Sequence, residues 1–285
     1  MSGVAVLGAG GLLGRHVVAR LAARGVPVAS FDRAACDVTD RDAVARALHG
    51  AEAVVNCAAY TNVDRAEAEP DLAHRANALG AEHVGSVARA TGVRLAIHVS
   101  TDFVFDGTKA TPYEETDPPN PLSVYARTKL EGERRFLDAL PDGVVVRVQG
   151  LYGAGGANFA SKLPELLRAG KALRLDAERR VQPTWAGAAA AQLVAFLDEG
   201  ERPSGLFHLS CTGATTWAGF TERLVERLGI DARFERVPTA ALTAPAARPP
   251  SCLFAHAALR RSGRFVLPSW EAAQDDFLRA SVVSR

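Results

Sequence analysis

Tyr125 and Lys129 are two residues whose types and spacing could carry out acid chemistry. They stand four positions apart in the segment SVYARTKLEGERRFL, which has helical character, so both side chains project from one helix face. A Tyr phenol has an ordinary pKa of about 10, and a neighbouring Lys charge lowers that pKa, which favours proton delivery near neutral pH. Most Tyr and Lys residues at this spacing only form a polar helix face. The surrounding elements must therefore decide whether this pair does chemistry.

Ser100 and Thr101 place hydroxyl groups at a second point where chemistry could occur. They end the apolar run LAIHVS, which has the pattern of a buried strand. Ligands of α/β proteins bind in the crevice beyond the carboxyl ends of parallel strands. The hydroxyl at this strand tip is therefore expected to face a ligand crevice.

The first thirty residues read as a strand, a glycine loop and a helix. The apolar residues 3–7 run into GAGGLLG, after which RHVVARLAARG has helical periodicity. In such a loop Gly8 allows a tight turn, Gly11 lets the backbone approach a pyrophosphate, and Gly14 permits close helix packing. The free N–H groups at the helix start attract phosphate. This order of elements predicts a dinucleotide-binding site.

Asp32 and Arg33 give conflicting indications of which nicotinamide cofactor binds. Asp32 ends the second strand pattern, VPVASF, 24 residues after Gly8, near the spacing expected of a residue that meets the adenosine ribose. A carboxylate favours the 2′-hydroxyl of NAD, whereas Arg33, together with Arg15, could hold the 2′-phosphate of NADP. A solvated turn at this point is the alternative without function. We expect NADPH, with NADH left open.

Strand and helix patterns alternate as far as Ser100, which predicts an α/β fold, a Rossmann-type doubly wound parallel sheet with a smaller C-terminal substrate-binding lobe. We expect residues 1–152 to form the dinucleotide-binding domain, completed by about residues 178–210. Residues 153–177 and 211–285 are expected to form the smaller lobe.

Composition bounds the remaining classes of protein. The chain has 285 residues, 48% of them hydrophobic, with 33 Lys and Arg against 32 Asp and Glu, for a net charge of +1. No basic or acidic block indicates nucleic acid or an anionic membrane as a partner. No run reaches the roughly 18 apolar residues of a spanning helix, and the N-terminus lacks a signal-peptide pattern. The expected location is the cytoplasm, and the oligomeric state stays open, with a homodimer as one alternative.

Neither a disulfide framework nor a metal site is indicated. The four cysteines have no CxxC spacing, and Cys57 lies in an apolar strand pattern where a reduced thiol packs as a small hydrophobe. Glu67 and Glu69 are expected to lie on a solvated helix face. We therefore predict no metal ligands.

Taken together, these segments resemble the extended short-chain dehydrogenases/reductases and, within them, the dTDP-4-dehydrorhamnose reductase family. The resemblance covers most of the chain. Its more specific parts are STDFVFDG and AAYTNVDRAE. The other matching segments are GAGGLLG, Pro121 through YARTKLEGE, VVRVQGLYG and Pro183-Thr184, with Arg248-Pro249 and Ser251 as an echo of the family's C-terminal segment.

The resemblance implies NAD(P)H-dependent reduction of the 4-keto group of a nucleotide-linked 4-keto-6-deoxy sugar, with thymidine diphosphate as the carrier, in deoxysugar biosynthesis. Tyr125 would protonate the carbonyl oxygen, Thr101 would hold that oxygen, and Lys129 would tune Tyr125 and bind the nicotinamide ribose. The implied cofactor residues are Gly8, Gly11, Leu12, Leu13, Gly14, Asp32, Arg33, Asp37, Val38, Ala58, Ala59, Tyr60, Thr61, Tyr125 and Lys129. The implied substrate residues are Val63, Thr101, Asp102, Tyr125, Gly150, Asn158 and Arg248.

Two departures from the family pattern bear on the substrate. Gly150 stands where the family usually has a Trp that packs against the sugar, which predicts a wider site or a shifted sugar, and hence a different or broader substrate. The alternative is that a neighbouring side chain, such as Tyr152 or Trp185, fills the space and leaves the specificity unchanged. The segment ERRVQPTW replaces the family's Asp-Gln-x-Gly-x-Pro-Thr, and its arginines could meet phosphate.

Two other functions stay open. A regulatory subunit of methionine adenosyltransferase resembles the same family and has a binding role without turnover, although such a protein has no need for the trio of Thr101, Tyr125 and Lys129. A sugar-nucleotide epimerase or dehydratase is the other. Dehydratases usually follow the Thr with Asp-Glu, and here Asp102 is followed by Phe103.

Overall fold

A parallel sheet of six strands lies at the centre of the computed structural model, which describes residues 3–156, 158–198, 200 and 202–283. Its strand order is β2-β1-β3-β4-β5-β9, and every pairing within it is parallel. The predicted fold class is therefore confirmed. The strands are β1 (Val4–Leu7), β2 (Val28–Phe31), β3 (Ala53–Asn56), β4 (Leu95–Thr101), β5 (Val144–Val148) and β9 (Gly205–Leu209).

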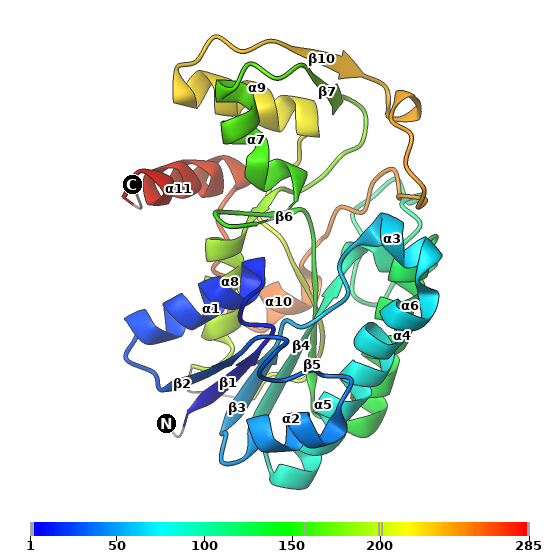
Figure 1. Cartoon of the computed structure of the whole chain (residues 1–285), viewed down its shortest axis with the longest axis vertical. Coiled ribbons are helices and arrows are strands. Elements are labelled where there is room, and N and C mark those ends of the chain that lie inside the picture. The colour runs from blue at the N-terminus through cyan, green and yellow to red at the C-terminus, as the bar shows by residue number, and fades with distance from the viewer. Residues whose placement is uncertain (1–2, 157, 199, 201, 284–285) are drawn as a thin grey trace.

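Helices cover both faces of this sheet (Figure 1). On one face α1 packs against α8, whose run of alanines lets the two helices approach closely. On the other face α5 packs between α2 and α6. The central strands are buried because both faces are covered, which explains their continuous apolar sequences. The helices are α1 (Leu12–Ala23), α2 (Arg41–Leu48), α5 (Gly80–Thr91), α6 (Val124–Ala139) and α8 (Ala186–Ala195).

The strand order of the sheet reverses between β1 and β3, so the chain leaves these two strands toward opposite faces of the sheet. The connection after β3 is built from three short elements that lead into α5. A 3-10 helix follows β4 directly. These elements are α3 (Val63–Ala68), α4 (Pro70–His74), the π-helix η1 (Arg75–Leu79) and the 3-10 helix η2 (Asp102–Val104).

The segment GVVVRVQGLYG reads as one strand in the sequence but forms two. β5 ends at Val148, and β6 (Leu151–Tyr152) pairs instead with β8 (Thr184–Trp185). The break occurs at Gly150, whose φ of 57° lies in the left-handed region. This turn carries the chain from the central sheet into a second group of elements.

That second group lies beyond the carboxyl ends of the strands, at the top of Figure 1. It holds a parallel pair of strands, β7 and β10, with α7 and α9 beside them. α10, by contrast, packs back against β9 of the central sheet. The elements are α7 (Phe159–Arg168), β7 (Leu173–Asp176), α9 (Trp217–Leu228), β10 (Phe234–Val237), the 3-10 helix η3 (Thr239–Ala241), α10 (Ala257–Arg261) and α11 (Trp270–Val283).

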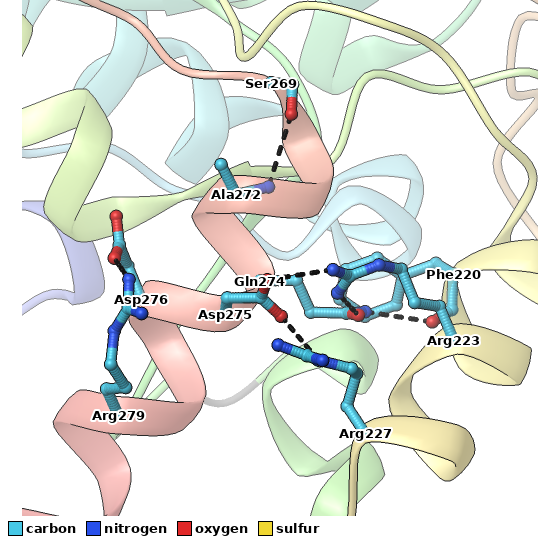
Figure 2. A network of polar contacts seen from close by, with 9 residues as sticks. All are labelled: Phe220, Arg223, Arg227, Ser269, Ala272, Gln274, Asp275, Asp276 and Arg279. Atoms are coloured by element: carbon cyan, nitrogen blue, oxygen red, sulfur yellow. Dashed lines mark hydrogen bonds and ion pairs between the residues drawn. The ribbon is translucent and has the colours of Figure 1, made fainter.

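Polar contacts attach α11 to α9 (Figure 2). Arg223 donates to Gln274 Oε1 at 2.7 Å and to Asp275 Oδ2 at 2.9 Å, and Arg227 donates to Asp275 Oδ1 at 2.8 Å. The described part of the chain contains no helix with the length and apolar character needed to cross a membrane.

Tyr152 places a hydroxyl group in the hydrophobic core, where it is unfavourable. Its side chain is fully buried, with ring centroids 4.9 Å from Phe220 and 5.3 Å from Phe277. Its hydroxyl has no hydrogen-bond partner among the described residues. Burial also raises the pKa of this phenol well above its usual value. A buried hydroxyl without a partner loses its hydration without compensation.

We expect Tyr152→Phe to stabilise the protein by about 1 kcal/mol, because it removes this uncompensated group and keeps the ring packing. Urea unfolding followed by fluorescence measures the change. Tyr113→Phe is the matched control, since the Tyr113 hydroxyl is also buried but donates to Asp106 Oδ1 at 2.9 Å and should therefore be costly to remove. An equal loss of stability in both variants would contradict the account.

Candidate active site

The glycine loop brings the start of α1 against the ends of β1 and β3. Gly8 has a φ of 72°, and a Cβ on it would lie 2.6 Å from the backbone nitrogen of Ala58. A Cβ on Gly14 would lie 2.3 Å from the carbonyl oxygen of Gly8. No larger residue fits at either position without moving the backbone. Gly11 caps α1 without a side-chain hydrogen bond, so the N–H groups of the first turn stay available for an anion.

A cleft of about 1210 Å³ opens above these strand ends. All the cofactor and substrate residues that the resemblance implies line this one cleft, together with others, whereas Arg15 does not. They are Gly8, Gly11, Leu12, Leu13, Gly14, Asp32, Arg33, Asp37, Val38, Ala58, Ala59, Tyr60, Thr61, Val63, Thr101, Asp102, Tyr125, Lys129, Gly150, Asn158 and Arg248.

Asp32 and Arg33 lie at the end of the cleft next to β2. Asp32 Oδ1 accepts from the backbone nitrogen of Ala35 at 2.9 Å, which shapes the turn after the strand. Arg33 has a side chain that is 85% exposed and lies 3.5 Å from Asp37 Oδ2, so its guanidinium is free to change partner. Arg15 instead donates to the carbonyl oxygen of Gly10 at 2.7 Å. Arg33 is therefore the better placed of the two cations to meet a 2′-phosphate.

Thr101, Tyr125 and Lys129 meet at the carboxyl end of β4. Ser123 begins α6 by accepting from the backbone nitrogen of Ala126 at 3.2 Å, which sets Tyr125 in the first turn. Thr101 ends β4, and its side chain is close enough to Tyr125 to lower the pKa of that phenol. Lys129 follows one turn later on the same face.

The protonation of Tyr125 differs from the sequence-based prediction. Burial raises the pKa of Tyr125 to about 12, the hydrogen bond with Thr101 opposes this rise, and the charge of Asp102 adds to it. The Nζ atom of Lys129 donates to the carbonyl oxygen of Val99 at 2.6 Å. The prediction that Lys129 lowers the pKa of Tyr125 is therefore wrong for this structure, because burial outweighs the favourable contacts of the phenolate.

Lys129 is itself buried, with 1% of its surface exposed. Burial lowers its pKa to about 8, against the opposing charges of Glu133 and Cys57. Its Nζ atom also lies 3.4 Å from His98 Nε2, and burial lowers the pKa of His98 well below the usual value. Burial at the floor of the cleft thus brings the pKa of Lys129 close to neutral pH.

Asp102 is the acidic group whose charge raises the pKa of Tyr125. It is 8% exposed, and burial raises its pKa to about 7, while a hydrogen bond from Gln149 lowers it. Its Oδ1 atom accepts from the hydroxyl of Thr101 at 3.2 Å. The pKa of this carboxyl group therefore lies near neutral pH, and the group lines the cleft.

Gly150 does not leave an open space. A Cβ at this position would meet Val181 Cγ2 at 2.9 Å and the carbonyl oxygen of Gln182 at 3.1 Å. The alternative that a neighbouring side chain fills the space therefore fits, but the neighbour is Val181. Neither named example takes that place, since Tyr152 points into the core and Trp185 packs edge-on against His16. The segment after β7 fills this part of the wall, and other aromatic side chains, Phe159 and Trp217, line the cleft.

Asn158 and Arg248 line the cleft while holding other partners. Asn158 caps α7 by accepting from the backbone nitrogen of Ser161 at 2.9 Å. Arg248 makes a two-pronged ion pair with Asp64, at 2.9 and 2.8 Å, and holds the pKa of Asp64 below its usual value. A ligand contact with either residue must therefore share or replace these bonds.

Sequence reasoning missed several residues that shape the site. Asn77 sits in the π-helix η1, accepts from Tyr60 N at 2.8 Å and donates to Thr128 Oγ1 at 3.1 Å, so it fixes the loop after β3 to α6. Helical periodicity gave no signal, because the π-helix adds a residue to the turn. Gln149 also lines the cleft and was not selected. Arg179 lines it too, and it is one of the arginines of ERRVQPTW that the sequence offers as candidates to meet phosphate.

A buried ion pair supports β4 and β5 from below. Arg147 and Glu133 have side chains that are 4% and 5% exposed, and they pair at 2.7 Å. Ser100 donates to the same carboxylate at 2.5 Å, and the guanidinium lies over the ring of Phe105 at 4.9 Å. This arrangement joins the strand of Thr101 to the helix of Tyr125. The described residues contain no cluster of His, Cys, Asp or Glu that could hold a metal ion.

The fold and the cleft together define a dinucleotide-binding protein of the extended short-chain dehydrogenase/reductase class. A sequence profile of the family described as RmlD substrate binding domain matches residues 1–283. The chain belongs to this family, as the resemblance predicted.

Relatives and solved structures agree over nearly the whole chain. The dTDP-4-dehydrorhamnose reductase of Streptomyces griseus is 39% identical over 275 residues, covering 94% of this chain and 90% of that protein. The dTDP-4-keto-6-deoxy-D-glucose reductase of Streptomyces niveus is 37% identical over 272 residues, covering 94% and 93%. The crystal structure of dTDP-4-dehydrorhamnose reductase from Bacillus anthracis in complex with NADP has a TM-score of 0.92 and 29% identity, covering 98% of this chain and 99% of that one.

We expect Arg147→Met to destabilise the protein by about 3 to 5 kcal/mol, because it leaves the charge of Glu133 buried without its cation. Chemical unfolding measures the loss. Arg174→Met is the matched control, since Arg174 pairs with Glu235 at side-chain exposures of 53% and 63%, where about 1 kcal/mol or less is at stake. Similar losses in the two variants would show that burial of the pair does not determine its importance.

Proposed function

We propose that this protein uses NADPH to reduce the 4-keto group of a nucleotide-linked 4-keto-6-deoxy sugar, with thymidine diphosphate as the carrier, in deoxysugar biosynthesis. The observation that carries the proposal is that Thr101, Tyr125 and Lys129 line the same cleft as the glycine loop. Membership of the family, together with the activities named for the relatives from Streptomyces, supports this reaction.

The residues present fit a dinucleotide. The close backbone contacts of Gly8 and Gly14 leave room for a pyrophosphate at the uncapped start of α1. Asp32 and Arg33 would hold the adenosine ribose and its 2′-phosphate, and Lys129, which donates to the Val99 carbonyl in this structure, would hold the nicotinamide ribose. When bound, the cofactor supplies a hydride for the carbonyl carbon.

Tyr125 supplies the proton. With a pKa of about 12 the phenol keeps its proton at neutral pH, so it can donate that proton when substrate binds. The phenol O–H bond would break and its proton would pass to the carbonyl oxygen as that carbon is reduced. The Thr101 hydroxyl, which donates to Asp102 Oδ1 in this structure, would turn to hold that oxygen. The phenolate left behind then regains a proton from solvent.

Arginines favour a phosphate-bearing substrate at the far end of the cleft. Arg179, Arg180 and Arg248 line this end. Arg180 is exposed, and Arg179 Nε makes no hydrogen bond among the described residues and only a 3.7 Å ion pair with Asp176 Oδ2. The diphosphate of the carrier nucleotide would satisfy these donors. We further propose that the lobe of residues 153–177 and 211–285 holds the nucleotide. The protein would act in the cytoplasm, where its free thiols stay reduced. A homodimer is one alternative for its oligomeric state.

We expect Tyr125→Phe to lower kcat by about 10²-fold or more while NADPH affinity stays nearly unchanged, because only the donated proton is lost. The assay follows NADPH oxidation with freshly generated dTDP-4-keto-6-deoxy-D-glucose, with and without a 3,5-epimerase. A variant with full activity would remove Tyr125 from the mechanism. A wild type inactive with both sugars would overturn the proposed substrate.

We expect Arg33→Ala to weaken NADPH binding by about 1.5 to 3 kcal/mol and to leave NADH little changed, because only NADPH carries the phosphate that Arg33 would meet. Fluorescence titration of each cofactor measures this. Arg41→Ala, an exposed arginine that does not line the cleft, is the control for a general charge effect. Equal weakening of both cofactors by Arg33→Ala would show that Arg33 contacts no phosphate.

A further inference from the structure

Gln149 is a buried amide that joins three segments of the cleft wall. It directly follows β5 and is 2% exposed. Its Nε2 atom donates to Asp102 Oδ2 at 3.0 Å and to the carbonyl oxygen of Cys252 at 2.6 Å. Its Oε1 atom accepts from the backbone nitrogen of Gln182 at 2.7 Å. The tip of β4, the C-terminal segment and the segment before β8 thus meet on one side chain.

The backbone partners determine which way the amide of Gln149 points. The nitrogen of Gln182 can only donate and the carbonyl of Cys252 can only accept, so a flipped amide would lose both bonds. One hydrogen of Nε2 is used by Cys252, and the other is directed at Asp102. The donor toward Asp102 is therefore imposed by the fold.

The same contacts explain what lies beside Gly150. Gln149 holds the backbone of Gln182 in place, and this segment brings Val181 and the carbonyl oxygen of Gln182 to 2.9 and 3.1 Å from the position of a Cβ on Gly150. Where the family pattern has an aromatic side chain, this chain has a polar wall held together by Gln149. Arg179 and Arg180 belong to the same segment.

Asp102 is held from two sides by these contacts. Thr101 donates to its Oδ1 atom and Gln149 to its Oδ2 atom. The charged and titratable groups that act on Asp102 come from three elements: Tyr125 of α6, Cys252 of the C-terminal segment, and Arg179. Each carboxylate oxygen can accept a further hydrogen bond, and Asp102 lines the cleft.

We propose that Gln149 is a positioning residue for the reduction, which fixes the carboxylate of Asp102 so that it accepts a hydrogen bond from a hydroxyl of the sugar. This inference rests on the proposed function, because it needs a sugar at this end of the cleft. Gln149 itself touches neither reacting atom. It acts through Asp102 and through the wall that it holds over Gly150.

Substrate affinity then depends on the ionisation of Asp102. Burial raises the pKa of Asp102 to about 7, and the Gln149 hydrogen bond lowers it, because the donated hydrogen favours the ionised form. Only the ionised form offers both oxygens as acceptors. KM for the sugar nucleotide should therefore fall as pH rises through the pKa of Asp102, and removal of the Gln149 donor should move that transition to higher pH.

The test compares Gln149→Leu and Gln149→Glu with the wild type. Gln149→Leu keeps the approximate shape and removes every hydrogen bond, whereas Gln149→Glu keeps the shape and places a second carboxyl group against Asp102. Gln192→Leu is the matched control, because Gln192 is equally buried and bonds to the carbonyl of Arg264 at 2.7 Å and the nitrogen of Val266 at 2.9 Å, away from the cleft. The measurements are kcat and KM for the sugar nucleotide and for NADPH, from about pH 5.5 to pH 9.

We expect Gln149→Leu to raise KM for the sugar nucleotide by about 10-fold or more at pH 7.5, with KM for NADPH unchanged. The pH midpoint of KM should rise by about one unit in Gln149→Leu and further in Gln149→Glu. Gln192→Leu should lose stability and keep both KM values and the midpoint. If Gln149→Leu does not fold, the midpoint of Gln149→Glu decides alone.

Unchanged KM and an unchanged midpoint in Gln149→Glu would overturn the proposal, as would equal changes in Gln192→Leu. A wild type without reductase activity would instead refute the proposed function. An active wild type whose Gln149 variants behave as it does refutes only the role of Gln149.

Discussion

The contact between Gly14 and Gly8 constrains everything that happens in the cleft. With a Cβ excluded at 2.3 Å from the Gly8 carbonyl oxygen, α1 starts directly above the end of β1, and its N–H groups open into the cleft. The neighbouring strand tips lie at the same level because the sheet is parallel. Thr101, Tyr125 and Lys129 therefore reach the same space as the site for a dinucleotide.

Burial is the second determinant of the chemistry, since it sets the charge of each group in the cleft. Tyr125 keeps its proton at neutral pH, whereas the pKa values of Lys129 and Asp102 lie close to neutral pH. Burying these groups is costly unless they have partners, and the structure provides them: a backbone carbonyl for Lys129 and two donors for Asp102. Beneath the strands, Arg147 and Glu133 are likewise buried as partners of each other.

Departures from the family pattern do not leave a gap in the wall. Gly150 has a left-handed backbone, and the segment of Val181 and Gln182 takes the space beside it. Gln149 holds this segment in place through the backbone nitrogen of Gln182.

The sequence alone determined the features that depend on short-range spacing. The parallel sheet, the glycine loop and the pairing of Tyr125 with Lys129 on one helix follow from periodicity and from the conformational freedom of glycine, and these are properties of a few neighbouring residues. The family resemblance extended the same local matches to the reaction class.

Only the tertiary structure decided the contacts between distant segments. Arg248 meets Asp64 across 184 residues and Gln149 meets the Cys252 carbonyl across 103, and no spacing rule relates such pairs. The direction of the Tyr125 pKa shift was predicted wrongly for the same reason. A pKa depends on how deeply a group is buried and on which charges the fold brings beside it, and neither is set by the residues next to it in the chain.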